Sequence, residues 1–318
     1  MRLGFAVKVL GNPNIKPNDT RRWQSEPHLS VSIGYLREVF EYLDDNNIRM
    51  YRMSSELAPY VTHPEMPQFH TQIEDCLDEL AELGETAREY SLRLSLHPSQ
   101  YIVLNSPDEG IAAAAVRDCL AQSMILDAMG LDREAVVVLH TGGVYGDKEA
   151  AKERFMRRYE ILPENVKHRL VLENDETSFS TTDVLEISRN VGITVVWDYL
   201  HHQINNREGM SIREAVEYSF DTWPEGCTPK IHFSSPRTEL REIKKKNPIT
   251  GKAEVELEPP LISQHADYIN PFEFLSFVRE VEGIRDFDVM VEAKAKDLAL
   301  LRLREHARTY SNGRVILE

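Results

Sequence analysis

The chain has 318 residues, and its 37 basic and 52 acidic residues give a formal net charge of −15. This length suits two average domains or one large α/β barrel, and either would bury a sizeable core. The acidic balance argues against a protein that binds nucleic acid through its overall charge, although divalent cations in a cleft would reverse the local sign. The three cysteines are far apart, which indicates neither a disulfide framework nor a zinc knuckle.

No secretory signal or membrane span is expected. The apolar N-terminal segment turns polar at 11–14, which is too early for a secretory signal with its cleavage site. No apolar run approaches the length that a membrane-spanning helix needs. We therefore expect a cytoplasmic protein that does not associate with a membrane.

Apolar, β-rich segments alternate with helical patterns along the whole chain. In chain order, the predicted strands are 3–9, 48–55, 92–97, 135–140, 169–174, 193–198, 229–235 and 287–294. The predicted helices are 31–46, 68–90, 108–129, 147–161, 181–190, 211–220, 271–282 and 296–309. Near-continuously apolar strands in such an alternation are typical of a parallel sheet covered by helices. Eight units of this kind predict a single (β/α)8 TIM-barrel domain over residues 1–318.

An open, doubly wound sheet is the alternative fold. It is disfavoured because no glycine-rich dinucleotide-binding loop follows the first strand. The segment 237–262 breaks the alternation, since it is charged, contains prolines and has no regular pattern. We predict that it forms a long irregular loop after the seventh strand, with a small hairpin around 247–251 as an option.

Six consecutive predicted strands end on or near a residue that can bind a metal ion. A single histidine at a strand end is more often a packing residue, but six such positions together are improbable by chance. In a TIM barrel the carboxyl ends of the strands form the active site. Three imidazoles and three carboxylates buried there would be unstable without cations, and this mixed donor set suits Zn, Mn or Fe. The six residues are His97, His140, Glu173, Asp198, His232 and Glu292.

The loops after the strands add further donors. His63 follows the second strand, His201 follows the sixth, and His265 follows the long segment. Because these donors are too many for one ion, we expect two or three divalent ions, with Glu173 able to bridge a pair. The remaining histidines are expected to lie on the surface, in packing contacts or pointing away from the site: His28, His70, His168, His202 and His306.

Lys230 precedes His232 by two residues on the seventh predicted strand. The alternation of side chains along a strand therefore points both toward the barrel axis. A lysine beside metal ions must be neutral, must meet an anionic phosphate, or must be carboxylated on its amine to a carbamate. The last option is a hypothesis that the intact mass of the protein would test.

Eight short motifs, spread over nearly the whole chain, together resemble the UV damage endonuclease family. They are SSELAPYVTHP (54–64), LHPSQY (96–101), VLHTGG (138–143), LEND (172–175), WDYLHH (197–202), KIHFSSPR (230–237), HADYI (265–269) and VEAKAKDLAL (291–300). The motifs are specific jointly rather than singly. The resemblance implies a TIM barrel with three metal ions, related to endonuclease IV. It also implies an enzyme that nicks DNA immediately 5′ of UV photoproducts and leaves a 3′-hydroxyl and a 5′-phosphate.

The resemblance further implies the metal ligands. By analogy with endonuclease IV, His97, His140 and Glu173 would hold one ion. Glu173, Asp198, His232 and Glu292 would hold a second ion, and His201 and His265 a third. The mixed donors make Mn the expected metal, with Zn, Mg or Co as alternatives.

The resemblance also implies roles for residues beside the metals. His63 and Lys230 match positions next to the phosphate, so together with Glu173 they are the candidate catalytic residues. Gln100 and Tyr101 match a pair that enters the duplex opposite the damage, where an aromatic ring can replace lost stacking.

The expected reaction is metal-assisted hydrolysis, in which bound ions lower the pKa of a water toward about 7 and Glu173 orients that nucleophile. The expected partner is damaged double-stranded DNA, bound by a monomer at the nucleoid without an organic cofactor. Candidates for phosphate contacts are Arg237, Lys244, Lys245, Lys246, Arg21 and Arg22.

Three alternative functions remain open. An abasic-site endonuclease of the endonuclease IV type would use the same metal chemistry and differ only in damage recognition. A metal-dependent sugar isomerase or epimerase shares the architecture, but it usually needs fewer ions and a paired base for C–H chemistry. A noncatalytic lesion-binding protein would have no reason to keep a complete set of ligands.

Overall fold

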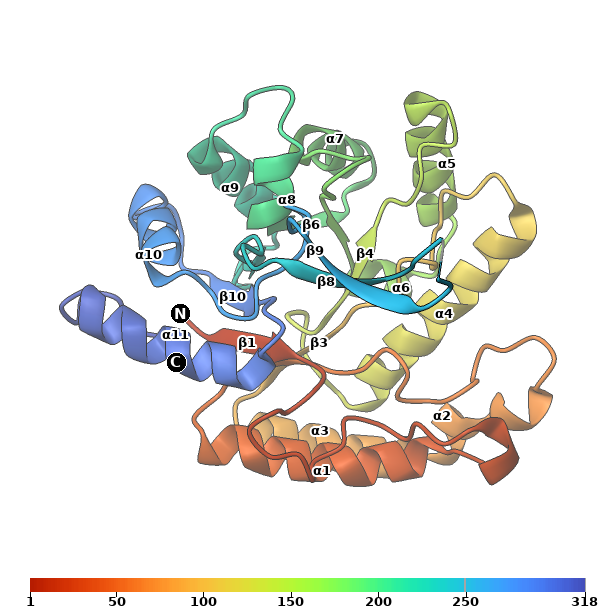
Figure 1. Ribbon diagram of the computed structural model, residues 1–318. Coiled ribbons are helices and arrows are strands. Elements are labelled where there is room, and N and C mark those ends of the chain that lie inside the picture. The colour runs from red at the N-terminus through yellow and green to blue at the C-terminus, as the bar shows by residue number, and fades with distance from the viewer. Residues whose placement is uncertain (249, 318) are drawn as a thin grey trace.

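Eight parallel strands form a closed barrel in the computed structural model, which describes residues 1–248 and 250–317 (Figure 1). Going round the barrel, the order is β1-β10-β7-β6-β5-β4-β3-β2, so strands that follow one another in the barrel sequence pair directly. Their bounds are β1 (Leu3–Ala6), β2 (Met50–Arg52), β3 (Arg93–Leu96), β4 (Val136–His140), β5 (Leu170–Glu173), β6 (Thr194–Asp198), β7 (Lys230–Phe233) and β10 (Asp288–Val291). The predicted TIM barrel is confirmed.

Helices surround the barrel and cover its outer face (Figure 1). The long helices are α1 (Leu29–Asp45), α3 (Leu77–Glu89), α4 (Glu109–Ala128), α5 (Lys148–Glu160), α7 (Thr181–Val191), α9 (Ile212–Asp221), α10 (Pro271–Glu280) and α11 (Lys296–Tyr310). The short ones are η1 (Trp23–Ser25), η2 (Pro67–Phe69), α2 (Gln72–Asp75), α6 (Glu164–Arg169) and α8 (Tyr199–Ile204). Within the described residues, no helix combines the length and apolar character needed to cross a bilayer.

Two of the helices begin at a side chain that caps the free backbone N–H groups of the first turn. The carboxylate of Asp108 accepts hydrogen bonds from the backbone N–H groups of Gly110 and Ile111 at the start of α4. The side chain of Asn270 caps α10 in the same way, followed by Pro271 in its first turn. Both caps satisfy backbone donors that have no partner inside a helix.

Two features of the predicted helices are wrong in detail. The single helix expected over 68–90 is interrupted at Cys76, whose backbone (φ −114°, ψ 20°) ends α2 and precedes α3. Apolar periodicity persists across this break, which is why the pattern did not reveal it. The helices α6 and α8 were missed because six residues are too few for a periodic pattern.

The strands divide their side chains between two cores. Leu94 and Leu96 of β3 pack toward the helices in the main hydrophobic core. Arg93, which alternates with them, donates a hydrogen bond of 2.8 Å to Asp288 of β10 across the barrel interior. A separate apolar cluster joins residues of β4, β5 and β6 to Trp223: Val136, Val138, Val171, Val196 and Trp223. These contacts fill part of the interior, and the metal-binding side chains stand at the carboxyl ends of the strands.

The segment 237–262 does not form the irregular loop that was expected. It contains an antiparallel pair of strands, β8 (Arg241–Lys246) and β9 (Ala253–Glu258), separate from the barrel sheet. The optional hairpin around 247–251 is thus the tip of a longer one, although Ile249 lies outside the described residues. The register pairs Arg241 with Glu258 and Lys245 with Glu254, and this complementarity was not recognised as a strand signal.

Candidate metal centre

All eight predicted ligands gather at one mouth of the barrel. The imidazole rings form a chain, with ring centroids 5.2 Å apart for His97 and His140, 5.9 Å for His140 and His201, and 6.4 Å for His201 and His265. The carboxylates of Glu173 and Asp198 end β5 and β6 beneath these rings. Residues that are as much as 195 positions apart in the chain are therefore neighbours here.

Glu173 occupies the centre of this arrangement. Its side chain is 1% exposed, its Oε1 accepts a hydrogen bond of 2.9 Å from His232 Nδ1, and its Oε2 accepts one of 3.0 Å from His97 Nε2. His140 Nε2 lies 3.7 Å from the same Oε2. Although burial favours the neutral carboxyl, the charges of His232 and His140 lower the pKa of Glu173 well below its usual value. Glu173 is therefore an anion shared among several histidines, as a bridging ligand must be.

Asp198 and His201 form a second part of the site, and the chain between them fixes their geometry. Asp198 is the N-cap of α8, and its Oδ1 accepts a hydrogen bond of 2.7 Å from the backbone N–H of His201. Nδ1 of His201 donates to the carbonyl oxygen of Asn174 at 2.9 Å. Burial opposes protonation of His201, but the charges of Asp198 and Glu173 outweigh it and raise the pKa of His201 to about 9. His201 therefore carries a proton where a cation would otherwise neutralise these carboxylates.

Glu292, directly after β10, completes the site. His232 Nδ1 lies 3.3 Å from its Oε1, and His265 Nδ1 lies 3.8 Å from its Oε2. Arg52 of β2 donates a hydrogen bond to Glu292 from the other side. Burial raises the pKa of Glu292, but Arg52 and then His232 reverse that effect and leave the pKa well below its ordinary value.

The donors fit divalent cations by position and by chemistry. Oδ2 of Asp198 and Nε2 of His232 are buried without a hydrogen-bond partner in the described part of the chain, which is uncommon for native polar atoms. Mixed imidazole and carboxylate donors suit Zn, Mn or Fe, and a cation would satisfy both orphaned atoms. Three groups have donor atoms that all lie within 4.8 Å of one another: His97, Glu173 and His232; Glu173, Asp198 and His201; Asp198, His232 and Glu292.

Lys230 lies below the donors, inside the barrel. It is 1% exposed, and among the described residues its Nζ has no hydrogen-bond partner. Burial, followed by the charges of Arg93 and Arg52, lowers the pKa of Lys230 far below its usual value. The predicted alternation with His232 on one strand is present, since both side chains are buried and their strand β7 faces the axis at these positions.

Two predicted ligands, His140 and His265, lie outside the three donor groups, and so do the other predicted site residues. His63 is partly exposed, and its backbone carbonyl accepts a hydrogen bond of 2.7 Å from His70 Nε2. Gln100 and Tyr101 are exposed in the loop after β3, with 76% of Tyr101 accessible. Arg237 lies at the root of the β8–β9 hairpin, 3.8 Å from Glu239.

His202 points away from the metal site, as expected. Its Nδ1 is 2.8 Å from the hydroxyl of Thr181, and its Nε2 is 3.1 Å from the carbonyl oxygen of Met210. Both ring nitrogens are thus engaged in structural hydrogen bonds.

Two residues of the site were not predicted from the sequence. Arg52 contacts Glu292, and alternation along β2 was a signal that its side chain faces the interior. Glu176 lies 3.6 Å from Nε2 of His201, the ring nitrogen that does not bind the backbone of Asn174. No spacing rule marks Glu176, because it stands in an irregular turn after the LEND motif.

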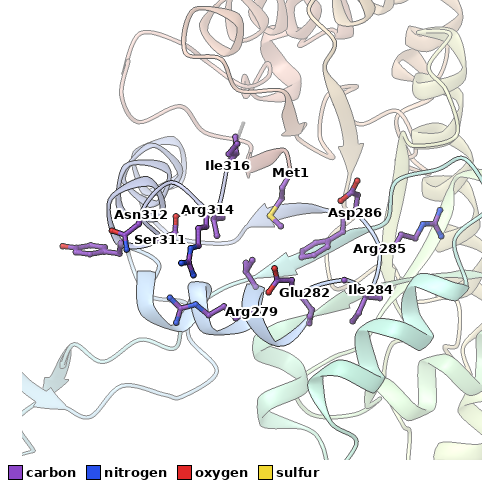
Figure 2. Close-up of a pocket in the computed structure, with 16 residues that line it drawn as sticks. Met1, Arg279, Glu282, Ile284, Arg285, Asp286, Ser311, Asn312, Arg314 and Ile316 are labelled. Atoms are coloured by element: carbon purple, nitrogen blue, oxygen red, sulfur yellow. Dashed lines mark hydrogen bonds between the residues drawn. The ribbon is translucent and has the colours of Figure 1, made fainter.

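A cavity of about 900 Å³ lies at the other end of the barrel and holds none of the predicted site residues (Figure 2). It lies between the end of α10, the chain after α11 and the residues that precede β1 and β10. Its lining mixes apolar side chains with arginines and carboxylates, including Met1, Phe287, Arg279, Arg314, Glu282 and Asp286. Because the strands begin there, it lies opposite to the face where TIM barrels carry their active sites.

Comparison with solved structures supports the architecture. The crystal structure of SacUVDE superposes with a TM-score of 0.81 and 29% sequence identity, covering 98% of this chain and 99% of that one. A D-psicose 3-epimerase from Clostridium cellulolyticum H10 gives a TM-score of 0.55 at 13% identity, over 98% of both chains. The similarity to the epimerase structure supports the barrel fold alone.

Sequence comparison with known proteins identifies the family of this chain. A UV DNA damage endonuclease of Bacillus pumilus is 36% identical over 276 residues, 86% of this chain and 79% of the relative. One from Bacillus cereus (strain G9842) is 34% identical over 319 residues, 95% of this chain and 93% of the relative. The family model described as "UV-endonuclease UvdE" matches residues 29–317. The chain therefore belongs to the UV-endonuclease UvdE family.

Proposed function

We propose that this protein is a metal-dependent endodeoxyribonuclease that nicks the DNA backbone immediately 5′ of UV photoproducts, leaving a 3′-hydroxyl and a 5′-phosphate. Pyrimidine dimers and 6-4 photoproducts are the proposed lesions, and abasic sites would extend the range. The observation that carries the proposal is the anionic Glu173, placed among the imidazoles of His97, His140 and His232 at the catalytic end of the barrel. Membership in the UvdE family supports DNA as the substrate.

We propose that two or three divalent ions, with Mn as the favoured metal, occupy this mouth. When bound, such ions supply Lewis-acid polarisation of a phosphate and a water of lowered pKa. Glu173 would be shared between two ions because each of its oxygens already contacts a different histidine. The proposed ligands are His97, His140, Glu173, Asp198, His201, His232, His265 and Glu292.

The protein groups around the phosphate have distinct proposed roles. Glu173 would orient the attacking water, and Lys230 and His63 would stand beside the phosphate. Gln100 and Tyr101 would enter the duplex opposite the lesion. The 76% exposure of Tyr101 leaves the ring free for this, since stacking on a base requires an open face. Arg237, whose backbone N–H donates to the carbonyl oxygen of Gln264 at the hairpin root, would contact a backbone phosphate.

The remaining features of the proposal concern the cellular setting. We infer a monomer that acts in the cytoplasm, at the nucleoid where damage occurs, without an organic cofactor. The local positive charge of the bound ions would offset the net charge of −15 where the substrate phosphate enters.

A cleavage assay tests the proposed function directly. Protein loaded with Mn is incubated with end-labelled duplexes that carry one photoproduct, one abasic site, or no damage. The expected result is a single cut immediately 5′ of the photoproduct, absent after chelation and in D198N protein. Cleavage at the abasic site alone would replace the proposal with an endonuclease of the endonuclease IV type. Cleavage of no duplex would overturn the nuclease assignment.

A further inference from the structure

The hairpin formed by β8 and β9, called the ribbon here, is attached at the metal mouth. Its two ends are joined by an isolated bridge between Pro236 and His265, and the backbone N–H of Arg237 donates to the carbonyl oxygen of Gln264 at 2.6 Å. His265 is itself one of the proposed ligands. In Figure 1 the ribbon runs across the view of the barrel instead of lying among the outer helices. A ligand held at the metals would therefore meet the root of the ribbon.

One face of the ribbon is neutralised by its own ion pairs. In an antiparallel pair, directly opposed residues share a face, and the faces alternate along each strand. Lys245 lies 2.8 Å from Glu256 and 2.7 Å from Glu258, and Arg241 lies 3.0 Å from Glu258. All these charges stand on the same face, so it has no net attraction for an anion.

The opposite face of the ribbon differs in its charge pairing and in its exposed apolar side chains. It carries Lys244 and Lys246, whose direct partners across the ladder are Val255 and Ala253, and one exposed carboxylate, Glu242, opposite Leu257, so its net charge is positive. Among the residues that the structure describes, neither lysine has an ion pair with a carboxylate, and both are exposed. Val255 is 57% exposed and Leu257, on the same face, is 62% exposed. Adjacent apolar side chains left open to water commonly mark a surface that a partner covers.

We propose that this open face of the ribbon docks on the duplex beside the lesion, with Lys244 and Lys246 against backbone phosphates. A two-stranded ribbon fits the major groove of B-DNA, and phosphate contacts by lysine fix the register of a protein on the duplex. Val255, opposite Lys244, and Leu257, opposite Glu242, then face the groove from the same side of the ribbon. The proposal rests on the proposed function, and it divides the Lys244–Lys246 run into two outer residues that bind DNA and a central one that does not.

The test compares two kinds of variant in the same binding assay. Affinity for a duplex with one photoproduct is measured by fluorescence anisotropy over a range of salt concentrations, for wild type, K244Q/K246Q and K245Q. The double variant should lower the magnitude of the salt slope by about two, because each phosphate contact contributes about 0.9 to it. Its affinity should fall by roughly tenfold or more at moderate salt. K245Q should leave the slope unchanged, because Lys245 already binds two carboxylates.

Equal slopes for wild type and K244Q/K246Q would overturn the proposal, as would an equal loss in K245Q. Thermal melting confirms that each variant is folded. Sedimentation tests whether a second copy of the chain covers this face instead of DNA. If wild-type protein is a dimer, and V255S/L257S is a monomer with the salt slope of wild type for DNA binding, DNA docking is refuted. Failure of the proposed nuclease function can be told apart from failure of this proposal. Wild-type protein that binds the duplex but never nicks it would contradict the nuclease function, and the salt slopes of the variants would still test the ribbon.

Discussion

Glu173 at the end of β5 accepts a hydrogen bond of 2.9 Å from Nδ1 of His232 on β7, across the intervening strand β6. The two residues are 59 positions apart in the chain and both are almost fully buried. A buried carboxylate whose two oxygens each contact a histidine indicates a cation-binding site, because core packing alone does not favour such a buried charge. The proposed chemistry depends on this contact.

Replacing Glu173 with glutamine should abolish both metal retention and activity. The amide keeps the size of the side chain but cannot act as an anion between two ions. Loss of an outer-shell partner weakens metal binding or activity by about 10- to 100-fold, so loss of a shared ligand should exceed that range. Metal content after dialysis and the single-turnover nicking rate measure the effect. The matched control, E160Q, alters an exposed carboxylate at the end of α5 and should behave as wild type. Normal metal content in E173Q would contradict the bridging role.

Metal uptake should release the proton of His201. The folded-state pKa of about 9 lies above the ordinary 6.5, so metal-free protein holds this proton at neutral pH. A metal ligand must be a neutral imidazole, so binding expels the proton. Calorimetry in two buffers of different ionisation enthalpy should give proton release that declines as the pH rises through about 9.

The His97 site provides the control for that measurement. Burial lowers the pKa of His97 to about 4, so its ring is already neutral and H97Q should leave the protons released per bound ion unchanged. H201Q should reduce them. The same shift makes a stability prediction: because the folded pKa of His201 is raised, its contribution to metal-free stability is complete below 6.5 and is lost as the pH rises through about 9. Proton release that is equal in wild type and H201Q would refute the assignment.

Removing the ring of Tyr101 should impair damage recognition without touching the metals. Stacking of a base on an aromatic side chain is worth about 1–3 kcal/mol by alanine substitution, or roughly 5- to 150-fold in affinity. Y101A should lose this amount on a photoproduct duplex while its metal content stays normal. Y101F retains the ring and should bind as wild type. Unchanged affinity of Y101A would remove the wedge role.

The carbamate hypothesis for Lys230 predicts an added mass. Carboxylation joins the neutral amine to CO2 through a new N–C bond and releases one proton, and burial beside Arg93 and Arg52 favours both the neutral amine and the anionic product. Intact-mass spectrometry under mild conditions should detect the mass of one CO2, lost on acidification and absent in K230Q. An unmodified mass, or electron density that ends at the ammonium, would eliminate the carbamate.

The strand-end residues were predictable because the barrel itself brings them together. Once the eight strands were identified, His97, Glu173 and Asp198 had to converge, since carboxyl ends of parallel strands share one face. The ribbon was not predictable in the same way. β9 alternates apolar and acidic residues, but β8 ends in three consecutive lysines, and only the folded hairpin shows that Lys245 meets Glu256 and Glu258. Contacts such as Glu176 with His201 depend on the conformation of a turn, which no periodic pattern encodes.

The most direct test of the account is anomalous diffraction from crystals grown with Mn. Two or three anomalous peaks are expected within the mouth of the barrel, one of them contacting Glu173 and each bounded by donors from the proposed ligand set. A metal-loaded crystal with no peak there, or with imidazoles of His97 and His232 turned away from any peak, would contradict the central claim.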